Sequence, residues 1–131
     1  MDKKVMAASS VLGPRVPLRG LVLMTPERAH RGYALTRFLA SMRDPSRRAV
    51  FSSDPEASMA AFGLCEVERG LVRRRDFDGM LGHGVSNVAI GKASAVLGTN
   101  LIERGARGRG QTAAEFIAER RALNEGQPWQ F

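Results

Sequence analysis

Three helix starts marked by proline, all within residues 25–55, constrain the fold of this chain more than any other feature. Each places a short polar residue directly before a proline: Thr25-Pro26, Asp44-Pro45 and Asp54-Pro55. The side-chain oxygen of Thr or Asp accepts a hydrogen bond from a free backbone N–H, and proline suits the first helical position because no N–H is needed there. Their close spacing predicts short helices joined by tight turns.

The rest of the chain extends this helical pattern. Leu35, Phe38, Leu39 and Met42 recur at the i, i+3, i+4, i+7 spacing of a buried helical stripe. Short helices are predicted over 25–43, 44–51, 54–62, 66–75, 76–81, 87–97 and 112–126. Their further core residues are predicted to be Val67, Leu71, Val72, Phe77, Met80 and Leu81. Almost nothing alternates like a strand, so we predict an all-α fold: a compact assembly of six or seven short helices with an extended N-terminal arm and a C-terminal tail.

This pattern divides the chain into three parts. Residues 1–24 are expected to form an extended arm because glycines and prolines interrupt any long helix there. Residues 25–126 form the expected helical domain, and residues 127–131 an aromatic tail. The apolar ends cannot easily reach the core of a small bundle, so they either fold back onto its surface or insert into another subunit.

Composition excludes several classes of protein. The 131 residues suffice for one domain, and the formal net charge of +7 predicts attraction to anions. No run reaches the roughly 18 apolar residues that a membrane span needs. The single cysteine, Cys65, rules out an internal disulfide framework and fits a reducing cytoplasm.

Residues suited to metal binding or nucleophilic catalysis are scarce. The two histidines, His30 and His83, are far apart and show no local ligand spacing. They could contribute to a two-His, one-carboxylate iron site only if the fold brought them together, which no local spacing indicates. We therefore predict no metal site and no catalytic residue in this chain. Cys65 has no base near it in sequence, which favours a packed or half-buried thiol over a nucleophile.

Two basic segments allow a second function class. Residues 103–110, ERGARGRG, are predicted to form a flexible basic loop, either solvated or bound to RNA through charge. No aromatic residue interrupts this segment to stack on bases, which disfavours nucleic-acid binding. The Arg73–Arg75 run is expected to be an exposed helical face. A basic nucleic-acid-binding module and a helical adaptor without an active site nearby remain alternatives.

Three longer segments together resemble a known family. They are TPERAHRGYALTRFLASM at 25–42, FGLCEVERGLVRRRDFDGML at 62–81 and SNVAIGKASAVLG at 86–98. Their order and spacing resemble the alpha (small) subunit of protocatechuate 4,5-dioxygenase and related extradiol dioxygenases. The resemblance implies an all-helical chain that pairs with a larger beta subunit. It further implies that the beta subunit holds a non-haem Fe(II) and the catalytic base, and that the enzyme opens a catechol-type ring with O2.

The resemblance also implies a role for this chain as a lid over the partner's active site. The residues expected to face that pocket are Asn87, Val88, Ile90, Lys92, Leu101 and Ile102. Asn87 could hydrogen-bond to substrate or cap a helix, Ile90 and Leu101 could wall the ring or fill the core, and Lys92 could attract a carboxylate or face solvent. The residues expected to contact the partner subunit are Leu21, Leu23, Trp129 and Phe131. Protocatechuate, gallate and related catechols all remain possible substrates.

Overall fold

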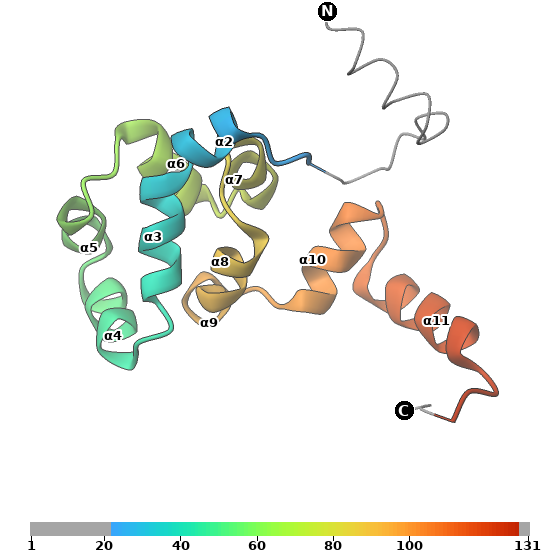
Figure 1. The fold of residues 1–131 in the computed structure, drawn as a ribbon. Coiled ribbons are helices and arrows are strands. Elements are labelled where there is room, and N and C mark those ends of the chain that lie inside the picture. Colours follow the sequence, from blue (N-terminus) through green and yellow to red (C-terminus); the bar gives the residue numbers. More distant parts are fainter. Residues whose placement is uncertain (1–21, 129–131) are drawn as a thin grey trace, which may run out of the picture.

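The computed structural model describes residues 22–128, and this range contains ten helices and no strand (Figure 1). The prediction of an all-α fold is confirmed for these residues. Leu21, Trp129 and Phe131 lie outside the described range. The helices are α2 (Pro26–Arg31), α3 (Tyr33–Ser41), α4 (Pro45–Ser53), α5 (Pro55–Ala61), α6 (Glu66–Arg74), α7 (Phe77–His83), α8 (Asn87–Lys92), α9 (Ser94–Leu97), α10 (Leu101–Gly108) and α11 (Ala113–Asn124). None of these helices is long and apolar enough to cross a membrane.

The three proline-marked starts are confirmed as N-caps. Thr25 Oγ1 accepts the backbone N–H of Arg28 at 3.2 Å. Asp44 and Asp54 accept backbone N–H groups in the same way, at 2.9 and 3.1 Å, and open α4 and α5. Local side-chain chemistry therefore explains where these helices begin.

There are more helices than predicted because two expected helices are divided and because α10 occupies a segment that was expected to be a loop. The helix expected over 25–43 breaks at Gly32, and the one expected over 87–97 breaks at Ala93. A Cβ added at Gly32 would overlap the carbonyl of Gly84, so the backbones of the α2–α3 junction and the end of α7 touch directly. This contact is possible only where no side chain intervenes.

The prediction of a flexible loop over 103–110 is wrong. Most of this segment belongs to α10, whose N-cap Asn100 accepts the backbone N–H of Glu103 at 2.9 Å. Asn at the cap and Glu three residues later match a helix start, a signal that the alternation of Arg and Gly hid.

The core forms around α3. Leu35, Phe38 and Leu39 are fully buried, and the ring of Phe38 packs against Phe51 and Phe62 with centroids 6.0 and 5.4 Å apart. The other buried residues of this cluster lie between Met42 and Leu97, on α4 to α9 and on the turns between helices, so the core is enclosed by α3–α9, with α2 at its edge. We call these eight helices the body.

Val67 was predicted to lie in the core but lies at the surface. Its side chain is 65% exposed, so its assignment to the core was wrong. The physical reason is that Glu68 takes the inward position in the first turn of α6, where it accepts the backbone N–H of Cys65 at 3.0 Å. A carboxylate that caps its own helix displaces the neighbouring valine outward.

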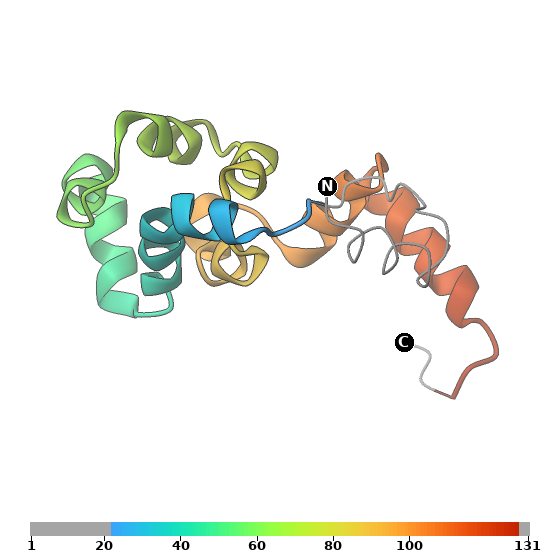
Figure 2. The same cartoon turned by 45° about the horizontal axis from the view of Figure 1, so that its top comes forward.

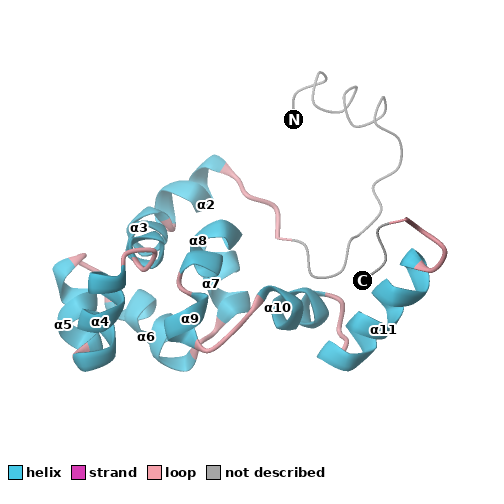
Figure 3. Cartoon of the chain, turned by 90° about the horizontal axis from the view of Figure 1, so that it is seen from below, coloured by secondary structure: helices cyan, strands magenta, loops and turns pink. Residues whose placement is uncertain are grey.

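The last two helices form a separate hairpin, Leu101–Asn124, that projects from the body (Figures 1 and 2). The main contacts of α11 are with α10, and no residue of α11 is buried. Figure 3 shows the same separation from below, with α11 at the end furthest from α4 and α5. A groove between the hairpin and the body brings together part of the predicted site.

Candidate functional site

A groove of about 540 Å³ lies between the body and the hairpin. Three of the predicted pocket residues, Asn87, Ile90 and Leu101, line it. Aromatic and aliphatic side chains from α7 and α11 supply much of the rest of its wall, among them Phe77, Leu81 and Phe116. Its basic residues are Arg104, Arg107, Arg109 and Arg120. An apolar groove edged with guanidinium groups suits a flat ring or an apolar segment that carries negative charge.

Asn87 opens α8 but does not cap it with its side chain. The N-cap is Ser86, which makes no side-chain capping hydrogen bond. Arg104 Nη1 donates to the side-chain Oδ1 of Asn87 at 2.8 Å and to its backbone carbonyl at 3.2 Å. Arg104 on α10 therefore fixes the side chain of Asn87. The alternative prediction, that Asn87 caps the helix, is wrong.

Arg104 is the functional candidate that sequence reasoning missed. Its Nε is buried without a hydrogen-bond partner, and it takes part in no ion pair within residues 22–128. A Cβ added at Gly91 would lie 3.4 Å from its Nη2, so the guanidinium also packs along α8. Burial lowers the pKa of Arg104, yet arginine stays protonated near neutral pH. The result is a fixed positive charge at the wall of the groove.

The remaining predicted pocket residues are spread over two faces. Val88 and Lys92 lie exposed on α8, and Leu101 is 72% exposed at the start of α10. Ile90 is fully buried within the core, although it reaches the base of the groove. Ile102 lies instead in a second groove between α10 and α11. The structure thus brings Asn87, Ile90 and Leu101 together and separates Ile102 from them.

The predicted contacts at the two chain ends lie mostly beyond the described residues. Leu23 is 69% exposed, and Val22 beside it lines the groove between the body and the hairpin. The chain therefore approaches this groove from its N-terminal side. The proposed partner contact of Leu23 stays a prediction.

The histidines and the cysteine form no common site. His83 Nε2 lies 3.1 Å from Glu68 Oε2, while His30 is exposed on α2. Burial alone would raise the pKa of Glu68, but hydrogen bonds from Cys65 and His83 outweigh it and hold the pKa below its usual value. Cys65 is exposed rather than packed, because it lies at the surface end of α6.

The side chains between residues 22 and 128 offer no group of three or more His, Cys, Asp or Glu that could hold a metal ion. They do not supply the two histidines and one carboxylate of the iron site considered above. The carboxylate nearest to a histidine, Glu68, is engaged in capping α6.

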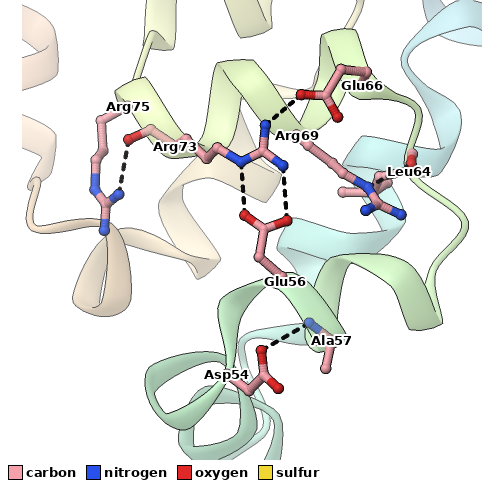
Figure 4. Close-up of polar contacts among 8 residues, drawn as sticks. All are labelled: Asp54, Glu56, Ala57, Leu64, Glu66, Arg69, Arg73 and Arg75. Carbon is pink, nitrogen blue, oxygen red and sulfur yellow. Dashed lines mark hydrogen bonds and ion pairs between the residues drawn. The ribbon is translucent and has the colours of Figure 1, made fainter.

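Part of the surplus positive charge is used inside the body. Arg73 binds both carboxylate oxygens of Glu56, at 2.7 and 2.8 Å, and also contacts Glu66 at 2.6 Å (Figure 4). These ion pairs join α5 to α6 and raise the pKa of Arg73. The run Arg73–Arg75 is exposed as predicted. The guanidinium of Arg73, however, is already paired with Glu56 and Glu66 and is not available to bind another anion.

Comparison with known proteins places this arrangement in a family. Residues 35–121 match the family described as the LigA subunit of the aromatic-ring-opening dioxygenase LigAB. A curated gallate dioxygenase from Pseudomonas putida strain KT2440 is 40% identical over 103 residues, which is 79% of this chain. The chain spans only 30% of the length of that relative. The protein belongs to the LigA subunit family of aromatic-ring-opening dioxygenases.

Proposed function

We propose that this chain is the non-catalytic small subunit of a heteromeric extradiol dioxygenase that opens a catechol-type ring with O2. The observation that carries this proposal is the family match, which runs from α3 into α11 and so includes both walls of the groove. Gallate is a proposed substrate because the relative is named for it, and protocatechuate and related catechol-type compounds are proposed because of the resemblance in sequence.

The catalytic metal belongs, in this proposal, to a larger partner subunit. The residues described here offer no ligand cluster for Fe(II), and the matched part is less than a third of the gallate dioxygenase. The other 70% of such an enzyme has room for the metal site and the catalytic base. The single cysteine fits a cytoplasmic location, which stays a prediction.

This chain would act as a lid, with the surface of α8 and the start of α10 over the partner's pocket. Leu101 and Val88 are exposed apolar groups that could cover one side of a ring, while Ile90 supports them from the core. The Asn87 amide could hydrogen-bond to a phenol oxygen because Arg104 fixes its orientation. Lys92 is exposed and could attract a substrate carboxylate.

Nucleic-acid binding has less support than it had from sequence alone. The Arg–Gly segment is a helix, and two of its arginines are paired: Arg107 with Asp78 at 2.9 Å and Arg109 with Glu119 at 2.8 Å. Their charge is partly neutralised within the chain.

The proposal is tested by purifying the full chain alone and together with the larger ring-opening subunit from the same source. Oxygen uptake with gallate and protocatechuate is expected only in the preparation that contains both, and it should rise until the two chains are equimolar. Ring cleavage by this chain alone, or activity of the larger subunit that does not change when this chain is added, would contradict the proposal.

A variant of the lid surface sharpens this test. Asn87→Ala should raise KM about tenfold with little change in kcat, since a single oriented hydrogen bond is worth about 1.4 kcal/mol. Ser52→Ala, an exposed position on α4, is the control and should leave both constants unchanged. An unaltered KM for Asn87→Ala would remove Asn87 from the substrate site.

A further inference from the structure

The outer side of the hairpin carries an apolar groove that the lid surface does not include. This second groove, of about 460 Å³, lies between α10 and α11 and is lined by Ile102, Phe116 and Ile117. Ile102 is 45% exposed, and Leu123, seven residues after Phe116 on the same helical face, is 63% exposed. We call these four residues the hairpin patch.

The hairpin patch has no cover from the body. Helix α11 has twelve residues but buries none of them, and its main contacts are with α10. The hairpin is joined to the body by polar links, Arg104 to Asn87 and Arg107 to Asp78, beside the first groove. Helices of this length depend on tertiary packing for most of their stability, and α11 has little of it within residues 22–128. We therefore expect a partner surface to pack against it.

The shape of the hairpin patch depends on one glycine. A Cβ added at Gly105 would lie 3.0 Å from the Phe116 ring, so glycine lets this ring settle between α10 and α11. The guanidinium of Arg120 lies 5.1 Å over the same ring and holds its other face. Phe116 lines both grooves as a result, and it divides the lid side of the hairpin from its outer side.

We propose that the hairpin patch is the surface by which this chain attaches to the larger catalytic subunit. The inference rests on the proposed function and adds to it the place of attachment. The family match extends to residue 121 and so includes α10 and most of α11, and that family is one subunit of a two-subunit enzyme. In the gallate dioxygenase, the matched segment shares a chain with more than twice its own length of other sequence, so in that relative a large further region is covalently joined to this unit.

Charge and position agree with this partner. Arg120, Arg121 and Glu125 edge the hairpin patch, two positive charges against one negative, so the partner's docking surface should be apolar with a mainly acidic border. Leu101 and Ile102 are adjacent on α10 but line different grooves. Successive residues of a helix point about 100° apart, so attachment through Ile102 would leave Leu101 on the adjoining side of α10, beside the docked subunit. Docking and substrate contact would then use neighbouring sides of one helix.

The test measures the dissociation constant between the full chain and the larger subunit, whose identity is confirmed by mass spectrometry and by ring cleavage of the reconstituted complex. Ile117→Glu and Leu123→Glu should each weaken binding by about 30-fold or more, because a charge is forced into an apolar contact. Val50→Glu introduces the same charge at a half-exposed apolar position on α4 and should bind as the wild type does. Far-UV circular dichroism checks that each variant is folded.

The outcomes separate this inference from the proposed function. If the wild-type complex is active and both hairpin variants bind normally, the attachment surface lies elsewhere and the proposed function stands. If the wild-type chain does not bind the larger subunit at all, the proposed function itself fails. If the variants abolish only self-association of the isolated chain, a second copy occupies the hairpin patch and the inference is overturned. Deletion of residues 1–21 tests whether the N-terminal segment of this chain covers the hairpin patch. The inference is equally overturned if this deletion raises the solvent exposure of the patch while the two charged variants leave binding unchanged.

Discussion

The body and the hairpin are made from similar helices but are stabilised differently. The body encloses a continuous apolar cluster around Phe38, whereas the hairpin buries only Ala106. Both parts have well-formed caps: Thr112 accepts the backbone N–H of Glu115 at the start of α11, as Thr25 does for Arg28. Local caps therefore determine where helices begin in both regions. Tertiary burial differs, because the body encloses an apolar cluster while Leu101, Ile102 and Leu123 of the hairpin are exposed.

The largest expected effect is a loss of stability when a core residue of the body, and not a residue of the hairpin, is shortened. Phe38→Ala should lower the free energy of unfolding by about 3–5 kcal/mol, because it removes a fully buried ring and leaves a cavity. Leu123→Ala in the hairpin should cost less than about 0.5 kcal/mol in the isolated chain. Urea denaturation followed by circular dichroism measures both, and similar costs would show that the hairpin is part of the core.

The second effect tests the close approach of Gly84 to the backbone of α2 within the body. Gly84→Ala should cost about 2–4 kcal/mol, because Gly84 has φ +111° and its added Cβ would overlap the carbonyl of Arg28. Gly63→Ala is the matched control, since Gly63 has φ +66° with nothing within 4 Å, and it should cost only about 1 kcal/mol. Equal costs would mean that backbone strain, and not the close approach of two segments, makes glycine necessary.

A third, smaller effect depends on pH and belongs to the body. The pKa of Glu68 is depressed in the folded state, so its stabilising contribution is complete above its unfolded pKa, near 4.5, and is lost as the pH falls through the lower folded value. We expect Glu68→Gln to lose about 1–2 kcal/mol at pH 7 and to flatten the stability profile below pH 4.5.

Chemical denaturation of the wild type and Glu68→Gln at several pH values gives this comparison. Glu115→Gln on α11 is the control, because Glu115 is exposed in the hairpin and should alter the profile little. Parallel profiles for the wild type and Glu68→Gln would exclude the contact between α6 and α7 as the origin of acid sensitivity.

The smallest effect concerns the link between the two regions. Asp78→Asn removes an ion pair with Arg107 whose two side chains are 66% and 58% exposed, so global stability should change by less than about 0.5 kcal/mol. Hydrogen exchange should nevertheless accelerate in α10 and α11 and stay constant in α3. Uniform acceleration across the chain would show that the hairpin does not open independently.

Much of the body could be predicted from the sequence because its signals are local. The polar residues before proline predicted three helix starts, and the stripe from Leu35 to Met42 predicted the buried face of α3. The break at Gly32 could not be predicted, because it depends on contact with Gly84, far along the chain.

The candidate site was less predictable than the fold. Asn87 and Leu101 were suggested by family resemblance, and the structure shows that they share a groove. Arg104 was hidden in an Arg–Gly segment mistaken for a loop, since its importance arises from a hydrogen bond across 17 positions. Ile102 was grouped with Leu101 by sequence proximity, but the helix turns their side chains into different grooves.

The direct contact between Gly32 and Gly84 has a consequence for how this chain can change by mutation. Neither position tolerates even a methyl group without moving backbone atoms. A substitution at one of them therefore forces α7 away from the junction of α2 and α3, so this close approach survives only while both positions remain glycine.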